Sequence, residues 1–253
     1  MKQPAFLAAM LLAIGVSTAP AAGLNLHWDN CVAGGGVQNK SFPCDDDFQT
    51  FELVAQFRLP SALNGVTGVE YVLDLAAAGP TLPQWWHFRF DECRPNQLLV
   101  NTVVPIGVGC PDWAGGLASG GVNPIYVTGL LGPNTARIEG GSFVSSANAR
   151  NLTNLTADYF LVNLLIQTDN TTTSGSSGVA CPGCDVPVCI VFNRCLVATP
   201  NTLGLVINTA QTQGSNFVTW QGGQGVTTFL GSGCPAATPT RASTWGAVKS
   251  LYR

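Results

Sequence analysis

The chain has 253 residues, only 10% of them charged, and a formal net charge of −3. This sparse, slightly acidic charge argues against nucleic-acid binding, which depends on a basic surface. Beyond the N-terminus no segment has the roughly 20 apolar residues that a membrane-spanning helix needs. We therefore predict a protein that does not span a membrane, and we leave its oligomeric state open.

The N-terminus has the layout of a secretory signal peptide. Lys2 precedes an apolar run from Ala5 to Val16, and small residues follow from Ser17 to Gly23. A charged residue, an apolar run and a small-residue cleavage site in this order are typical of export. We predict a signal peptide over residues 1–21 and a secreted, extracellular or cell-surface protein. Cleavage after Ala22 and retention as an uncleaved anchor are the alternatives.

Strand patterns dominate the rest of the chain. Short apolar or alternating runs, separated by turns rich in Gly, Pro and Asn, predict strands near residues 51–57, 66–75, 85–90, 125–131, 136–143, 159–167, 188–198, 203–207, 216–220 and 226–230. Such a series predicts an all-β fold. We expect a single antiparallel β-sandwich, jelly-roll or immunoglobulin-like, over residues 22–238. The polar loop 169–178 is alternatively a linker between two smaller domains.

Residues 239–253 form a separate C-terminal tail in this interpretation. Trp245, Val248 and Leu251 share one face of a helix, which predicts a short C-terminal helix. This helix either packs on the sandwich or serves as a docking or sorting element.

The sequence contains nine cysteines, which export would expose to an oxidising compartment. Pairs that flank Gly- and Pro-rich loops predict two local disulfides, Cys31–Cys44 and Cys93–Cys110. Cys195 lies inside an apolar strand pattern, so we predict that it is the free thiol. The remaining four are expected to form two bridges whose connectivity stays open: Cys181, Cys184, Cys189 and Cys234.

These cysteines allow two other interpretations. Cys181 and Cys184 form a C-x-x-C motif, but redox catalysis needs the first cysteine at a helix N-terminus, and no such helix is predicted here. A four-cysteine zinc site is also conceivable, although oxidation during export works against it. Structural disulfides are therefore preferred.

The sequence contains few candidate catalytic residues and motifs. The only histidines are His27 and His87, and no serine-hydrolase or metalloprotease motif contains them. Many carboxylates are present, but no spacing singles out the pair that a glycosidase needs. We therefore expect binding or structure rather than catalysis, with a secreted glycan hydrolase as an alternative. No cofactor is predicted, apart from a possible structural calcium ion.

The candidate calcium site combines a short acidic run with a neighbouring carboxylate. Asp45, Asp46 and Asp47 are consecutive, and a Cys31–Cys44 bridge would bring Asp29 near them. Calcium prefers several oxygen ligands of this kind. The EF-hand spacing is absent, and a solvated acidic loop explains the same residues.

Tryptophans are the main candidates for ligand contact. Trp85 and Trp86 are adjacent, so on a strand one would face the core and the other the solvent. Trp113 and Trp220 each lie beside Gly-rich segments with polar neighbours. An exposed indole near polar side chains suits a glycan or a surface protein, so these four residues are the predicted binding face.

Three segments carry a resemblance to known sequences. They are LPQWWHFRFDECR over residues 82–94, CPGCDVPVCIVFN over residues 181–193 and TWGAVKSLYR over residues 244–253. The chain resembles uncharacterised secreted bacterial proteins. The resemblance implies export and brings no known activity. We therefore expect a secreted or cell-surface binding or structural domain, with a hydrolase and a subunit of an extracellular assembly as alternatives.

Overall fold

The computed structural model describes residues 21–120, 124–200, 202–212 and 215–223. Fourteen strands and four single-turn 3₁₀ helices make up the regular structure of these residues. The strands are β1 (Gly23–Trp28), β2 (Asn39–Lys40), β3 (Thr50–Arg58), β4 (Leu63–Val66), β5 (Gly68–Ala77), β6 (Leu98–Asn101), β7 (Ser119–Gly120), β8 (Ile125–Thr128), β9 (Thr135–Phe143), β10 (Arg150–Leu152), β11 (Tyr159–Gln167), β12 (Val188–Thr199), β13 (Thr202–Ile207) and β14 (Phe217–Trp220). The 3₁₀ helices are η1 (Val32–Gly34), η2 (Gln84–Trp86), η3 (Ser146–Asn148) and η4 (Gln221–Gly223). The all-β prediction is confirmed.

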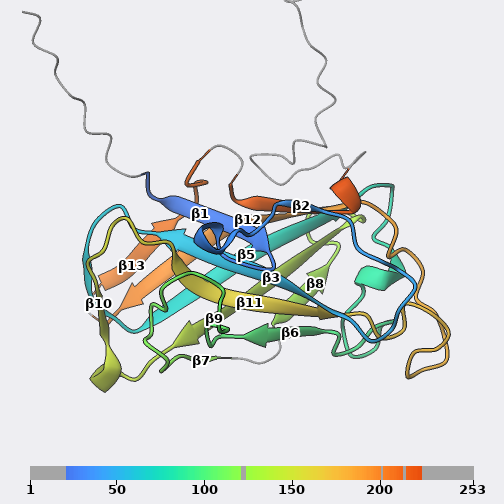
Figure 1. Ribbon diagram of the computed structural model, residues 1–253, viewed down its shortest axis with the longest axis horizontal. Coiled ribbons are helices and arrows are strands. Elements are labelled where there is room, and N and C mark those ends of the chain that lie inside the picture. The colour runs from blue at the N-terminus through green and yellow to red at the C-terminus, as the bar shows by residue number, and fades with distance from the viewer. Residues whose placement is uncertain (1–20, 121–123, 201, 213–214, 224–253) are drawn as a thin grey trace, which may run out of the picture.

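The strands form two main layers (Figure 1). A four-stranded sheet has the order β1-β3-β11-β6, and a larger sheet has the order β2-β14-β12-β5-β9-β7, with β13 added to β12 and β8 added to β9. Strands β4 and β10 form a separate pair. All pairings are antiparallel except β14 with β2, so the expectation of a purely antiparallel fold is wrong at that short contact.

One apolar core lies between the two sheets. Strand β3 turns Phe51, Leu53 and Phe57 inward, and β5 turns Leu73 and Leu75 inward, all at most 8% exposed. The alternation has a period of two, as a half-buried strand requires. Strands β11 and β12 lie on opposite sides of the 169–178 loop in sequence, and both contribute residues to this same core.

The segment predicted as a strand at residues 85–90 is instead a turn. Pro83 precedes η2, and the backbone N–H of Trp86 bonds to the Pro83 carbonyl at 3.0 Å. This i to i+3 pattern places both adjacent tryptophans in the core rather than on opposite faces. Strand β1, which sequence patterns did not indicate, pairs along its whole length with β3.

Some predicted features lie outside the described residues. These are the signal peptide, the strand near 226–230, Cys234 and the C-terminal helix. Within the described part of the chain, no helix is long and apolar enough to cross a membrane.

The disulfides join segments that are distant in sequence. They are Cys31–Cys110, Cys44–Cys184 and Cys93–Cys181, with sequence separations of 79, 140 and 88 residues. The local pairs Cys31–Cys44 and Cys93–Cys110 were therefore wrong, because neighbours in a sheet structure often come from remote parts of the chain. No reduced C-x-x-C pair exists, since Cys181 and Cys184 belong to different bridges.

The expectation that Cys181, Cys184, Cys189 and Cys234 form two bridges among themselves is also wrong, because Cys181 pairs with Cys93 and Cys184 with Cys44. The bonding state of two other cysteines agrees with the prediction. Cys189 is disulfide-bonded, and Cys195 is the free cysteine of the described residues. Cys195 is 0% exposed, and burial raises the pKa of its thiol. Its side chain therefore packs within the apolar core.

Candidate functional site

The four tryptophans proposed as a binding face are all buried. Trp85, Trp86, Trp113 and Trp220 are each at most 1% exposed, so that prediction is wrong for every one of them. Large aromatic rings stabilise a fold most when they are removed from water, and here all four pack in the core. None of them is available to stack against a ligand.

Trp220 is the centre of a buried aromatic cluster at one end of the core. Its ring stacks on Phe42 at 4.1 Å and lies 4.8 Å from Trp85 and 5.3 Å from Trp86, measured between centroids. Its indole N–H donates to the carbonyl of Cys184, which ties the cluster to the Cys44–Cys184 bridge.

Arg94 is buried against this cluster. Its guanidinium lies 3.6 Å from the centroid of the Trp85 ring. It donates to the carbonyls of Trp85 at 2.8 Å, of Asp169 at 3.0 Å, and of Gln167. Burial lowers the pKa of Arg94 to about 9, although the charges of Asp169, Tyr126 and Asp47 act in the opposite direction. Arg94 thus ties its own segment to two others, the turn at Trp85 and the chain at Gln167 and Asp169.

The acidic residues proposed for calcium do not form a common site. Asp29 pairs with Lys40 at 2.6 Å, Asp45 is exposed, and Asp46 accepts from the backbone N–H of Phe48. Among the described residues, no group of three or more acidic, histidine or cysteine side chains is placed to hold a metal ion. The bridge that would have drawn Asp29 toward the acidic run does not form, because Cys31 pairs elsewhere.

A hollow that we call the end pocket lies where β3 begins and β11 ends. Thr50 pairs with Gln167, and the N–H of Gln167 donates to the carbonyl of Gln97 at 2.9 Å. These three residues form a row across β3, β11 and the start of β6. Their neighbours Phe51, Ile166 and Leu98 point into the core, so the row faces outward.

The end pocket has a volume of about 460 Å³. Side chains able to hydrogen-bond line nearly all of it. The lining residues are Asp47, Phe48, Gln49, Thr50, Gln97, Gln167, Asp169, Ser174 and Ser176. The exception is Phe48, whose residue surface is 86% exposed. An exposed aromatic ring therefore stands beside a concave polar surface.

Two carboxylates fix the wall of the end pocket. Asp47 accepts from the backbone N–H of Thr172 at 2.8 Å and from the Thr172 hydroxyl. Asp169 accepts from the backbone N–H of Ser176 at 2.7 Å and from its hydroxyl. Burial acts to raise the pKa of Asp169, but these hydrogen bonds and the Arg94 charge lower it overall. Both carboxylates thereby hold the 169–178 loop over the pocket.

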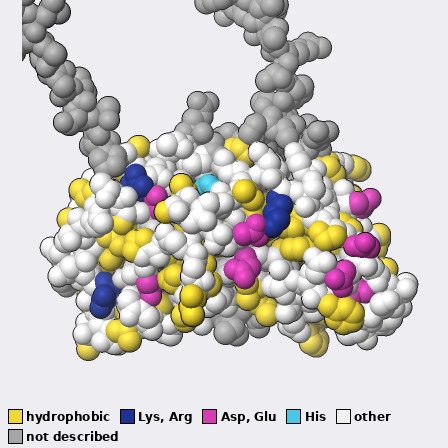
Figure 2. Space-filling view, viewed as in Figure 1, with side chains coloured by type: hydrophobic (Ala, Val, Ile, Leu, Met, Phe, Trp, Pro, Cys, Tyr) yellow, Lys and Arg dark blue, Asp and Glu magenta, His cyan; other side chains and the backbone are white. Residues whose placement is uncertain are grey.

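The end pocket lies in an acidic region of the surface. Figure 2 shows acidic side chains, and no Lys or Arg, at the right-hand end of the molecule on that face. The loops around residues 40–49 and 168–187 lie at this end in Figure 1. None of the pocket's lining residues is basic. The pocket is therefore suited to a neutral or cationic ligand rather than an anion.

A second hollow crosses the outer face of the larger sheet, and we call it the sheet groove. It has a volume of about 570 Å³. Glu70, Glu139 and Arg194 line it together with Ile125 and Phe143, which are 63% and 58% exposed. Gly141 and Glu70 are paired in register, and a side chain at position 141 would crowd the Val69 carbonyl and the Glu70 side chain.

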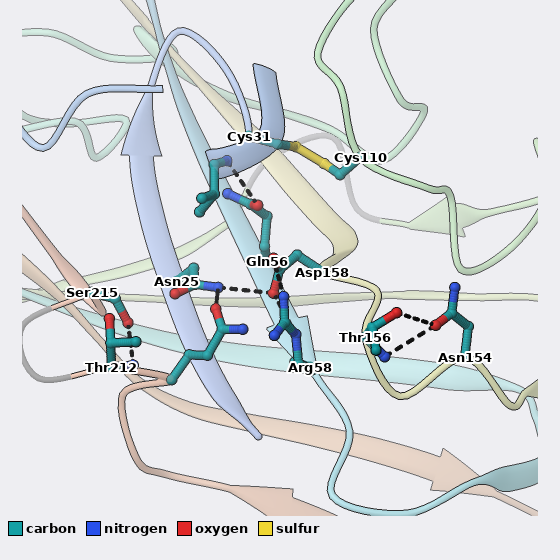
Figure 3. Close-up of polar contacts among 12 residues, drawn as sticks. Asn25, Cys31, Gln56, Arg58, Cys110, Asn154, Thr156, Asp158, Thr212 and Ser215 are labelled. Atoms are coloured by element: carbon teal, nitrogen blue, oxygen red, sulfur yellow. Dashed lines mark hydrogen bonds and ion pairs between the residues drawn. A yellow bond between two sulfur atoms is a disulfide. The ribbon is translucent and has the colours of Figure 1, made fainter. Parts of the chain in front are cut away.

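A polar cluster on the four-stranded sheet crosslinks the strands (Figure 3). Arg58 donates to Asp158 through Nε at 3.1 Å and through an Nη atom at 2.7 Å. Asn25 also donates to Asp158 at 3.1 Å, and Gln56 accepts from the backbone N–H of Val32. Because Arg58 and Asp158 already bond each other with near-ideal geometry, the cluster is a structural crosslink between β3 and the chain leading into β11.

The predicted histidines do not form a catalytic relay. His27 is 8% exposed, and burial lowers the pKa of its imidazole while the charge of Asp158 opposes this. His87 lies 3.4 Å from Glu92 and contacts the Leu82 carbonyl. The two histidines belong to different parts of the fold, β1 and the end of η2.

Comparison with known proteins gives little further guidance. No protein-family model matches the sequence, and no curated protein matches it. Among solved structures, the chain is similar to a cohesin module from the family 33 glycoside hydrolase of Clostridium perfringens ATCC13124, at 10% identity and a TM-score of 0.29. That alignment covers 78% of this chain and 93% of the module. A similarity of this size carries no functional argument.

Proposed function

We propose that the protein is a secreted binding domain for neutral glycans and that the end pocket is its binding site. The observation that carries this proposal is the exposed ring of Phe48 beside a pocket of carboxylate, amide and hydroxyl side chains. Sugar hydroxyls both donate and accept hydrogen bonds, while the apolar face of a sugar ring packs on an aromatic ring. The end pocket offers both kinds of contact in one place.

Charge supports a neutral ligand. Asp47 and Asp169 line the pocket, and the nearest cation, Arg94, is buried with its donors directed to backbone carbonyls. An anionic glycan would meet two carboxylates without a compensating basic side chain on the surface. The disulfides agree with a protein that works outside the cytoplasm.

The test is binding of the oxidised mature protein to a panel of soluble and insoluble neutral glycans. We expect Phe48→Ala to weaken binding about tenfold, because loss of about 1.4 kcal/mol of ring contact has that effect. Phe143→Ala is the matched control, since Phe143 is also an exposed phenylalanine but lines the sheet groove. Absence of binding to every glycan would refute the proposal, and a loss confined to Phe143→Ala would move the site to the groove.

A second candidate function is glycan hydrolysis in the sheet groove. Glu70 pairs with Gly141, and Val72 pairs with Glu139, so the two glutamates are diagonal neighbours on one face. The backbones of such neighbours are roughly 7–8 Å apart, so two long side chains can bring their carboxyl groups to the separation found in glycosidases. The test is release of reducing ends from the same panel. Activity that disappears in both Glu70→Gln and Glu139→Gln would favour hydrolysis, and no activity in the unsubstituted protein would exclude it for that panel.

A further inference from the structure

A third hollow, the edge pocket, lies close to the end pocket. It has a volume of about 270 Å³ and is lined by Phe88, Arg89, Phe90, Asn96, Leu98, Pro124 and Tyr126. Phe88 and Tyr126 form its aromatic floor, with their rings in an edge-to-face contact at 5.3 Å. Phe90 is 90% exposed and stands at the side of this floor. The edge pocket therefore repeats the combination of an exposed phenylalanine with polar neighbours.

Neighbouring residues just before β6 line the two pockets. Asn96 lines the edge pocket and Gln97 lines the end pocket, and consecutive Cα atoms are about 3.8 Å apart. Asn96 has a positive φ of 62°, and the Gln97 N–H bonds back to the Arg94 carbonyl, so the chain turns sharply here. Gln97 belongs to the outward-facing row, whereas Leu98 points inward and is 4% exposed. The pockets thus lie on two sides of one edge strand.

Nothing else in the four-stranded sheet lies beyond this strand. β6 is the last strand in the order β1-β3-β11-β6, so a ligand that leaves the end pocket can pass around its first residues. Phe48 and Phe90 then contact the ligand at separate points. A single sugar would use only one of these rings, whereas a chain of sugars would use both.

We infer that the ligand is a linear neutral glycan chain that runs from the end pocket around the start of β6 to the edge pocket. This inference depends on the proposed function and specifies its ligand. The end pocket provides hydrogen bonds and the Phe48 ring for the first sugars. The edge pocket adds the Phe90 ring and the side chains of Asn96 and Arg89 for later sugars.

The experiment measures the affinity of the oxidised mature protein for dimers and hexamers of neutral gluco-, manno-, xylo-, galacto- and chito-oligosaccharides. We expect at least one series in which the hexamer binds about tenfold more tightly than the dimer. Phe90→Ala is expected to remove that advantage and leave dimer affinity unchanged, while Phe48→Ala weakens both. Ile106→Ala is the control, because Ile106 is fully exposed and lines none of the three pockets.

The outcomes separate the two proposals. Equal affinity for dimer and hexamer, or a length advantage that survives Phe90→Ala, would overturn the extended site while the end pocket remains the binding site. Failure of all five series to bind would overturn the extended site together with the proposed function. A length advantage lost only in Phe90→Ala would support the chain ligand.

Discussion

Replacement of Arg94 by methionine tests whether a buried cation stabilises this fold. Arg94 is 0% exposed, and burial lowers its pKa to about 9. Burial therefore disfavours the charged form of its side chain. If only the cost of burying the charge mattered, Arg94→Met would stabilise the protein, because methionine has a similar length and no charge.

The contacts of Arg94 act in the opposite direction. It donates to the carbonyls of Trp85, Gln167 and Asp169, and hydrogen bonds to a charged group are each worth about 1.5–3 kcal/mol. The guanidinium over the Trp85 ring adds about 2 kcal/mol when desolvated. Methionine would leave these buried carbonyls without the donors that Arg94 supplies, at a cost of about 1–3 kcal/mol for each unsatisfied group. We expect Arg94→Met to lower the free energy of unfolding by about 3 kcal/mol.

The assay is urea denaturation at pH 7, with Arg89→Met as the control. Arg89 has a half-exposed side chain 3.9 Å from Asp91, so its loss should change stability by less than about 0.5 kcal/mol. If Arg94→Met were as stable as the unsubstituted protein, the three carbonyl contacts would not contribute as argued. The reasoning would also fail if Arg89→Met were the more damaging change.

Three further predictions concern stability and reactivity. Burial lowers the pKa of His27, so the unfolded chain binds its proton more readily, and the free energy of unfolding should fall as the pH drops below 6.5. In thermal unfolding at pH 7.5 and pH 5, the fall in midpoint between the two pH values should be smaller for His27→Gln than for the unsubstituted protein. An equal fall in both would contradict this. Replacing Cys44 and Cys184 together by serine should lower the free energy of unfolding by about 3–5 kcal/mol, because the bridge joins residues 140 positions apart. An unchanged denaturation midpoint would show that this disulfide does not stabilise the fold. Cys195 should react with iodoacetamide only in denaturant, since it is fully buried with a raised pKa, and labelling of the native protein would show that the core opens there.

Strand positions were largely predictable, because the pattern that reveals them is local. Residues 51–57, 159–167 and 188–198 each correspond to a long strand of the structure. The turn at residues 84–86 was missed because alternating aromatic residues in that segment imitate a strand. The local bond from the Trp86 N–H to the Pro83 carbonyl closes the turn, and the backbone N–H of Trp85 bonds to the Pro182 carbonyl, 97 residues away in sequence. The second contact is tertiary, so the local pattern carries no sign of it.

The candidate site was less predictable than the fold. Thr50, Gln97 and Gln167 carry no motif, and their common row depends on the register between β3, β11 and the residues before β6. The disulfide pairing failed for the same reason, since the sheets bring together residues that are 79 to 140 positions apart. Phe48 was the one detectable signal, as an aromatic residue directly after three aspartates in a polar segment.

The buried tryptophans remain connected to the proposed binding site, although they do not touch a ligand. Trp85 packs on the Arg94 guanidinium, and Arg94 holds the backbone of Gln167 and Asp169, both of which line the end pocket. The Trp85 indole also donates to the hydroxyl of Thr171, at the base of the 169–178 loop. Because the loop that forms the pocket wall is already held in place, less conformational entropy is lost when a ligand binds. Under the proposed function, the aromatic cluster would contribute to binding by positioning the pocket's polar groups before the ligand arrives.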